Sequence, residues 1–212
     1  MQVPRLEDLM REYTARKFEL DVHGVYFLRD ITDAQAEAFA KAMIILGAAR
    51  ANRPDAPITI YINSGGGSVG AGLAIMEMIA RAKREYNVQV DTVVTGYAYS
   101  MGAVVAQGGD KRVMGSLSTM MLHGGSILVA GDVEKVFRDY QKLEAQYRKL
   151  ICDIFACRTG LHDAAWWQRF IYSGRDRFLS AQECLELGLV DEVADSLSIL
   201  CDQAASARQR RQ

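Results

Sequence analysis

Short apolar runs alternate with longer amphipathic segments along most of the chain. Four largely apolar runs predict strands at residues 25–28, 58–62, 88–95 and 119–122, and a short strand is also predicted at 111–114. Helices are predicted from an N-cap at Thr32 to about Ala49, and over about Ala71–Arg84. The strand Ile58–Ile62 has no polar face, which favours a sheet covered on both sides. The pattern therefore indicates an α/β fold.

The longest periodic segment, Asp132–Ala156, predicts one long helix. Its apolar residues advance by alternating steps of three and four: Val133, Val136, Tyr140, Leu143, Tyr147, Leu150 and Ile154, with Phe137, Ile151 and Phe155 widening the stripe. At 1.5 Å per residue this helix would be about 35 Å long, comparable with the diameter of the domain. A core helix would show the same stripe, but a compact domain cannot easily cover it along its whole length. We therefore expect a projecting helix whose stripe packs against another subunit.

Composition and charge narrow the class of protein. A chain of 212 residues fits one α/β domain, here divided into an N-terminal arm (1–21), a domain (22–195) and a C-terminal tail (196–212). The formal net charge of −1 argues against a nucleic-acid partner. We expect no membrane association and a cytoplasmic location, because no window has the length and apolarity of a membrane span and the N-terminus lacks the apolar core of a signal peptide.

The four cysteines (Cys152, Cys157, Cys184 and Cys201) show neither a CxxC motif nor the spacing of a zinc site. We therefore expect reduced thiols and no bound metal.

Ser100 stands where the predicted strand at 88–95 gives way to a short helix around Ala103–Ala106. Serine is a favoured N-cap residue, and this is the simplest explanation of its position. The same position suits a nucleophile, because the free N–H groups at a helix start can stabilise a developing oxyanion. Ser100 alone leaves both interpretations open.

His123 directly follows the predicted strand at 119–122 and precedes two glycines. A lone histidine is most often structural, but α/β sheets gather their ligand sites at the carboxyl ends of strands. His23 and His162 do not follow a strand in this way, and we interpret both as structural.

Asp176 precedes a short helix predicted over Ala181–Leu187. The capping box of Ser180 with Glu183 begins this helix, and Gly188 suits its end. Asp176 could pair with one of the arginines that flank it, or it could orient an imidazole.

The glycine-rich segment Asn63–Gly70 follows another predicted strand. It is a weak candidate for a phosphate loop, because it lacks a Lys-Ser/Thr ending and an acidic residue at ribose spacing. Its glycines would also let backbone N–H groups approach a substrate carbonyl closely.

Four separated segments resemble the ClpP family, the proteolytic subunits of Clp proteases, in the same order along the chain. They are Tyr61-Ile62-Asn63-Ser64 with Gly66-Gly67, Ser100-Met101-Gly102, Met121-Leu122-His123, and Arg175–Ala181 with Gly188-Leu189-Val190-Asp191. Together they cover roughly Val25 to Val193. The resemblance implies a crotonase-like ββα spiral in which the helix at 132–156 is a protruding handle helix.

The resemblance also implies a mechanism. Ser100 would be the nucleophile, His123 the general base and then acid, and Asp176 the orienting carboxylate, with the backbone N–H groups of Gly67 and Met101 forming an oxyanion hole. The implied protein is a serine endopeptidase that cleaves peptides and unfolded proteins, without a cofactor. Family members are homo-oligomers of two stacked heptameric rings that enclose the sites. A separate Clp-type AAA+ unfoldase hydrolyses the ATP and threads substrates into this barrel.

Some positions depart from the family pattern. Gly65 stands where the family usually has proline. After His123, Gly124-Gly125-Ser126 stands in place of the usual Gln-Pro, and the segment from there to the handle helix is several residues shorter than in the family. Tyr172-Ser173-Gly174 stands in place of residues that are often acidic. The first twenty or so residues do not match the usual axial-loop sequence.

Three alternatives stay open. A crotonase-type acyl-CoA enzyme would share the fold without requiring the three candidate side chains together. A catalytically silent subunit could complete a mixed ring. A Ser–Lys peptidase would need a membrane anchor and a catalytic lysine, for which Lys111 is the candidate.

Overall fold

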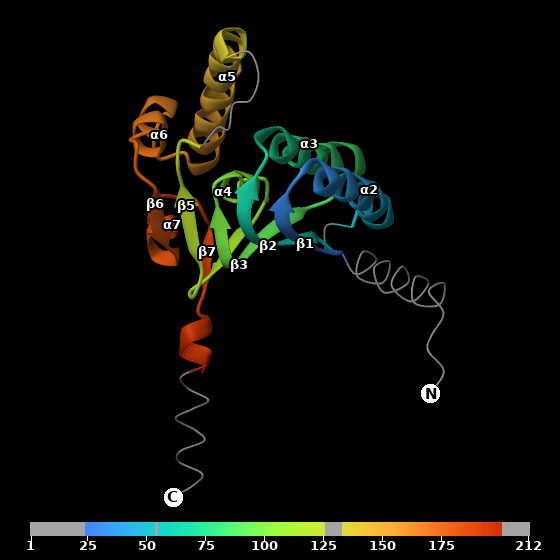
Figure 1. The fold of residues 1–212 in the computed structure, drawn as a ribbon. Coiled ribbons are helices and arrows are strands. Elements are labelled where there is room, and N and C mark those ends of the chain that lie inside the picture. The colour runs from blue at the N-terminus through green and yellow to red at the C-terminus, as the bar shows by residue number, and fades with distance from the viewer. Residues whose placement is uncertain (1–23, 54, 126–132, 201–212) are drawn as a thin grey trace, which may run out of the picture.

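The computed structural model describes residues 24–53, 55–125 and 133–200, and the predicted N-terminal arm lies outside these residues (Figure 1). Within the described ranges, seven strands form one sheet: β1 (Val25–Ile31), β2 (Ile58–Gly67), β3 (Val90–Tyr99), β4 (Arg112–Gly115), β5 (Thr119–Leu122), β6 (Arg177–Ser180) and β7 (Glu192–Ala194). The helices are α2 (Asp33–Arg50), α3 (Val69–Tyr86), α4 (Met101–Ala106), α5 (Val133–Thr159), α6 (Ala164–Ile171) and α7 (Ala181–Glu186). This is the predicted α/β class.

The strand order is β1-β2-β3-β4-β7, and every pair along this path is parallel. β3 also pairs with β5, and β5 pairs antiparallel with β6. β3 therefore changes partner along its length, from β4 at Thr92–Val94 to β5 at Tyr97–Tyr99. The hydroxyl of Ser118 bridges this branch point, because it accepts from the Gly96 amide at 2.9 Å and donates to the Val94 carbonyl at 3.2 Å.

Helices α2 and α3 lie on one face of β1, β2 and β3 (Figure 1). Alternate strand residues face them and are buried, among them Leu28, Ile60 and Val94. Thr32 caps α2 as predicted, since its side chain accepts from the Gln35 amide. This packing forms the main core of the domain.

The opposite face of these strands carries exposed aromatic residues. Phe27 is 59% exposed and stacks on Tyr61, with 5.3 Å between the ring centroids. The ring centroids of Tyr97 and Tyr99 are 4.9 Å apart. Within the described residues no helix covers Phe27, so the expectation of a sheet covered on both sides is wrong for this part of the chain. Parallel sheets are normally covered on both faces, which makes this aromatic surface a candidate contact with another molecule.

Helix α5 extends beyond the rest of the domain, as predicted for a projecting helix (Figure 1). Its C-terminal part packs into the domain, where Cys152 and Phe155 are buried and Phe155 stacks on Trp167 of α6 at 5.1 Å. Leu143 and Leu150 are 39% and 44% exposed. The side chains of residues 133–140 lie outside the described part of the helix, so contact of the stripe with another subunit stays a prediction.

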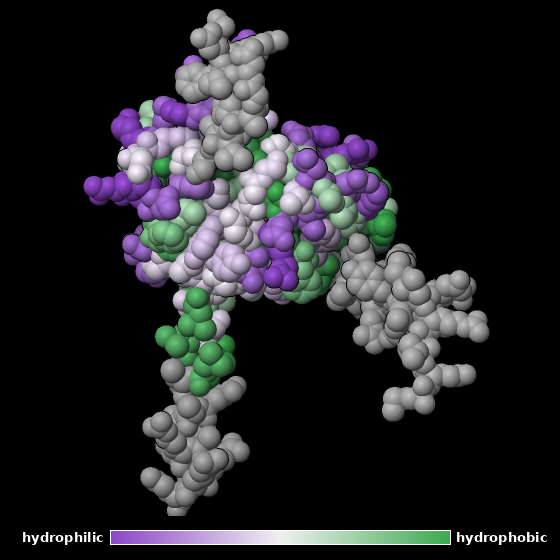
Figure 2. Space-filling view, in the orientation of Figure 1, coloured by the Kyte–Doolittle hydropathy of each residue, from purple (hydrophilic) through white to green (hydrophobic). Residues whose placement is uncertain are grey.

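A short helical segment at residues 196–200 follows β7. Leu197, Ile199 and Leu200 are all more than half exposed on it, and this segment is the green group directly below the main body of the molecule in Figure 2.

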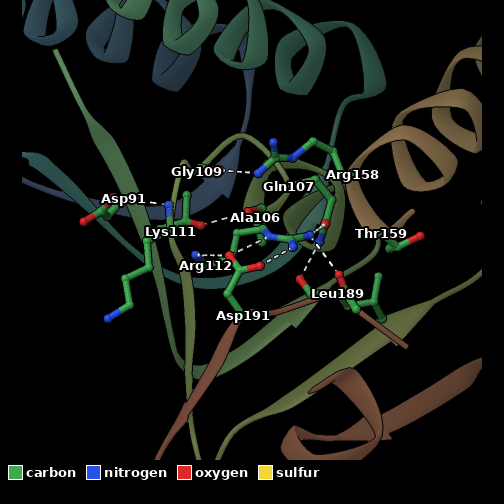
Figure 3. Close-up of polar contacts among 12 residues, drawn as sticks. Asp91, Ala106, Gln107, Gly109, Lys111, Arg112, Arg158, Thr159, Leu189 and Asp191 are labelled. Atoms are coloured by element: carbon green, nitrogen blue, oxygen red, sulfur yellow. Dashed lines mark hydrogen bonds and ion pairs between the residues drawn. The ribbon is translucent and has the colours of Figure 1, made fainter. Parts of the chain in front are cut away.

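Arg112 joins three parts of the fold through a buried guanidinium (Figure 3). Its Nε and Nη2 donate to the two carboxylate oxygens of Asp191 at 3.0 and 2.5 Å, and its Nη1 donates to Gln107 Oε1 at 2.8 Å and to the Gly188 carbonyl at 2.9 Å. The hydrogen bond from Arg112 is the main reason why the pKa of Asp191 is lowered. The network fixes the start of β4 to the end of α4 and to the segment that leads into β7. Nearby, Arg158 of α5 donates to the Gly109 carbonyl.

Candidate active site

Strand register brings the three predicted side chains to one edge of the sheet. β3 and β5 are parallel with Tyr99 opposite Met121, and the Ser100 amide continues the pairing by donating to the Met121 carbonyl at 2.8 Å. His123 therefore emerges beside Ser100. β5 and β6 are antiparallel with Leu122 opposite Arg177, which places Asp176 on the other side of His123.

The three side chains form a chain of polar contacts. His123 Nε2 lies 2.8 Å from Ser100 Oγ, which is a hydrogen bond. His123 Nδ1 lies 3.6 Å from Asp176 Oδ1, which is longer than a hydrogen bond but within ion-pair distance. The alternative was that Asp176 pairs with Arg175 or Arg177, and neither ion pair is formed among the described residues. The Arg177 guanidinium donates instead to the Phe170 carbonyl and to Ser173 Oγ.

Ser100 occupies a tight turn between β3 and α4. Its φ of 52° and ψ of −121° lie in a region that non-glycine residues rarely adopt, at a cost of about 1–3 kcal/mol. Ser100 is at the N-cap position, but its side chain makes no capping hydrogen bond and contacts His123 instead. The capping interpretation of its hydroxyl is therefore wrong. A sharp strand-to-helix turn of this kind also presents the nucleophile in α/β-hydrolases.

The first part of the glycine-rich segment extends β2, whereas the sequence predicted that this strand ends at Ile62. β2 continues to Gly67 because Asp30 and Ile31 of β1 pair with Gly66 and Gly67. The segment passes close to Ser100, since a Cβ added to Gly66 would lie 2.8 Å from Ser100 Cβ and 3.2 Å from the Met101 nitrogen. Met101 is the first residue of α4, where backbone N–H groups have no partner within the helix. The role of the Gly67 and Met101 amides as an oxyanion hole stays a prediction.

A pocket of ≈ 90 Å³ opens beside Ser100 and His123, between the sheet domain and α5. Seven apolar side chains line it: Val69, Met101, Val104, Leu122, Ile151, Phe155 and Ile171. Glu144, Tyr147, Arg148 and Tyr172 add polar groups. Burial raises the pKa of Tyr172 to about 12, so its hydroxyl is neutral at physiological pH. The pocket suits an uncharged side chain next to the serine.

Sequence reasoning missed this pocket. Tyr147, Ile151 and Phe155 belong to the apolar stripe that was expected to face another subunit, and the structure places them against a pocket of their own chain. Helix α6 and the strand β6 were not predicted either, and Ile171 ends α6.

Lys111 is distant from Ser100. Its backbone carbonyl accepts from the Thr92 amide near the start of β3, whereas Ser100 follows the end of that strand, roughly 25 Å away at 3.3 Å per residue. The ammonium group pairs with Glu192 Oε2 at 2.6 Å, and this hydrogen bond is the main reason why the pKa of Lys111 is raised. This geometry argues against a Ser–Lys site.

The described residues contain no group of three or more His, Cys, Asp or Glu side chains arranged to hold a metal ion. None of their helices combines the length and apolarity needed to cross a bilayer.

An α/β sheet that presents a serine, a histidine and a carboxylate side by side at one edge has the arrangement of groups found in Ser-His-Asp hydrolases. The model of the Clp protease family matches residues 8–197. The chain therefore belongs to the Clp protease family, and its α/β fold with a projecting helix agrees with the ClpP-like fold that the motifs implied.

Individual relatives agree with this assignment. A protein of Rhodococcus jostii (strain RHA1), named ATP-dependent Clp protease proteolytic subunit 3, is 33% identical over 181 residues, which cover 84% of each chain. A protein of Bacteroides fragilis (strain ATCC 25285), named ATP-dependent Clp protease proteolytic subunit, is 37% identical over 146 residues, or 66% of this chain and 65% of the relative. The chain thus spans slightly less than two thirds of the Bacteroides relative.

Proposed function

We propose that this chain is a serine endopeptidase of the ClpP type, which hydrolyses peptides and unfolded polypeptides through an acyl-enzyme on Ser100. The observation that carries the proposal is the 2.8 Å hydrogen bond between His123 Nε2 and Ser100 Oγ, with Asp176 facing the other ring nitrogen. A serine hydroxyl is a poor nucleophile at neutral pH and needs such an adjacent base, which a third group holds in place.

The geometry supports a two-stage reaction. His123 takes the hydroxyl proton as Ser100 Oγ attacks the scissile carbonyl carbon, and the resulting oxyanion accepts hydrogen bonds from the amides of Gly67 and Met101. His123 then gives the proton to the leaving amine, and the C–N bond breaks to leave an ester on Ser100. A water molecule, deprotonated by His123, hydrolyses this ester. Asp176 stabilises the imidazolium, and a small approach from 3.6 Å would bring it to hydrogen-bond distance.

Exposed apolar surfaces support an assembly. The Phe27–Tyr61 stack lies on the open face of the sheet, and Leu143 and Leu150 are exposed on the projecting helix. We assign these surfaces to contacts between copies of this chain, in two heptameric rings stacked into a barrel. The names of the relatives include the term ATP-dependent, and we propose that a separate Clp-type unfoldase hydrolyses this ATP. The reaction at Ser100 would need no cofactor. We place the assembly in the cytoplasm.

Reaction of the purified chain with a fluorophosphonate probe tests the proposed nucleophile. We expect covalent modification of Ser100, detected by mass spectrometry, because His123 lies at hydrogen-bond distance from its hydroxyl. The variant His123→Ala is expected to react at least about 100-fold more slowly, since general-base transfer typically contributes 10²–10⁴-fold. A crotonase-type acyl-CoA enzyme or a silent ring subunit would leave Ser100 unmodified, and that result would count against the proposal.

Alanine substitutions at two adjacent glycines should have opposite effects. Gly66 has a φ of 96°, and a Cβ there would lie 2.8 Å from both Ser100 Cβ and the Tyr99 carbonyl oxygen. We expect Gly66→Ala to lower the unfolding free energy by about 1–3 kcal/mol and to slow probe labelling of Ser100.

Gly65 is the matched control. A Cβ on Gly65 would meet no atom within 4 Å, and its φ is not positive. Gly65→Ala is expected to raise the unfolding free energy by about 0.4–1 kcal/mol, because alanine restricts the unfolded chain. Denaturant titration of both variants measures the difference. Equal stabilities would show that the packing of Gly66 against Ser100 is described incorrectly.

A further inference from the structure

One wall of the pocket beside Ser100 carries an ion pair. Arg148 donates to Glu144 Oε1 from Nε at 3.0 Å and from Nη2 at 2.5 Å, one turn apart on α5. The Arg148 guanidinium carbon also lies 4.5 Å from the centre of the Tyr172 ring. The two charged side chains are only 37% and 25% exposed, so both are partly withdrawn from water. Arg148 is therefore held between a carboxylate and an aromatic face.

The charges of this pair act on the interior of the pocket. Burial is the main reason why the pKa of Tyr172 is raised, but Arg148 lowers this pKa and Glu144 raises it. The two side chains thus influence the same hydroxyl with opposite signs. All three residues line the pocket together with Ser100 and His123.

A charged substrate side chain would lose water on entering this pocket and would find no free partner. Glu144 is already neutralised by Arg148, and Arg148 by Glu144. A lysine would have to approach a pair that includes a cation, and a glutamate would have to approach a pair that includes an anion. The remaining lining is largely apolar and offers no compensating charge. An uncharged side chain meets neither problem.

We propose that Glu144 and Arg148 jointly determine the charge selectivity of this pocket, so that the substrate residue whose carbonyl is attacked must carry an uncharged side chain. The pocket borders Ser100, so this residue, termed P1, is the one whose side chain can enter it. The inference rests on the proposed peptidase function. It predicts that the two residues exclude opposite charges: Arg148 excludes lysine and arginine, and Glu144 excludes aspartate and glutamate.

The test uses a series of fluorogenic peptides that differ only at P1, with Leu, Phe, Lys or Glu. The wild-type chain is expected to cleave the Leu and Phe peptides and to discriminate strongly against the other two. Arg148→Met keeps an unbranched apolar stem but removes the guanidinium and leaves Glu144 unpaired, so kcat/KM for the Lys peptide should rise at least tenfold relative to the Leu peptide. Glu144→Gln should give the mirror image, with at least a tenfold relative gain for the Glu peptide. Ratios between substrates cancel general losses of activity.

Neighbouring residues of the same helix provide a matched control. Lys149 pairs with Asp153 at 2.6 Å with the same spacing, but neither residue lines the pocket. Lys149→Met and Asp153→Asn are expected to leave both ratios unchanged within twofold. Arg148→Lys retains the positive charge and should continue to exclude the Lys peptide.

The outcomes separate the two proposals. If the wild-type chain cleaves no peptide and Ser100 is not labelled by the fluorophosphonate, the proposed function itself fails. If peptides are cleaved but the ratios in Arg148→Met and Glu144→Gln equal those of the wild type, only the assignment of charge selectivity is overturned. Should Arg148→Met fail to fold, Glu144→Gln tests the same pair through the opposite charge.

Discussion

Replacing Ser100 with alanine is expected to reduce peptide hydrolysis by about 10⁴-fold or more while leaving the fold intact. The hydroxyl is hydrogen-bonded to His123 and does not cap α4. Its removal therefore takes away the attacking oxygen and leaves the hydrogen bonds of the helix in place. Activity is measured by hydrolysis of an uncharged fluorogenic peptide, the fold by circular dichroism, and the molar mass of the assembly by light scattering. We expect the same molar mass in solution for the variant as for the wild type.

A second serine provides the control for this experiment. The hydroxyl of Ser116 accepts from the Leu197 amide, and Ser116 does not line the pocket. Ser116→Ala should therefore hydrolyse the peptide at the wild-type rate. Turnover by Ser100→Ala within tenfold of the wild type would refute the assignment of the nucleophile.

Replacing Arg112 with methionine is expected to lower the unfolding free energy by about 3 kcal/mol, the low end of the range for breaking a buried ion pair. The substitution removes the donors to Asp191, Gln107 and the Gly188 carbonyl at once (Figure 3). The low end applies because the Asp191 side chain is 40% exposed and can regain water. Denaturant titration at a fixed protein concentration measures this change.

The preceding residue is the natural control for Arg112. The Lys111–Glu192 pair is about half exposed on both sides, so Lys111→Met should lower the unfolding free energy far less than Arg112→Met does. Similar losses for the two variants would contradict the structural role of the buried guanidinium.

Acid should weaken the Arg112 network. The folded chain lowers the pKa of Asp191, so ionised Asp191 stabilises the fold at all pH values above its ordinary pKa. This contribution is lost as the pH falls through the lowered value. The variant Asp191→Asn should therefore be less stable than the wild type at neutral pH, and the difference should shrink toward acid.

The sequence predicted much of the fold because periodicity reports directly on burial. The boundaries of β5 agree with the apolar run Thr119–Leu122, and the capping box of Ser180 with Glu183 is formed at the start of α7. The extension of β2 through its glycines could not be predicted in this way. Glycine has a low strand propensity, and Gly66 and Gly67 belong to β2 because β1 supplies pairing partners.

The candidate site could be predicted only in part. Motif resemblance named Ser100, His123 and Asp176, but their convergence depends on the register of β3, β5 and β6, which no local pattern specifies. Glu144 and Arg148 were missed because only the apolar positions of α5 predict burial. A charged i,i+4 pair usually lies on a solvated helix face, and only the contact of Arg148 with Tyr172 shows that this pair borders a pocket.

The backbone of Ser100 has a consequence for how the chain tolerates change. Glycine adopts a φ of 52° far more readily than serine, so the residue best suited to the geometry of this turn lacks the hydroxyl that the chemistry requires. Selection for thermal robustness alone would thus favour an inactive protein at this position. Laboratory evolution toward a higher melting temperature should be monitored for replacement of Ser100 by glycine, because this single substitution would raise stability and abolish reactivity together.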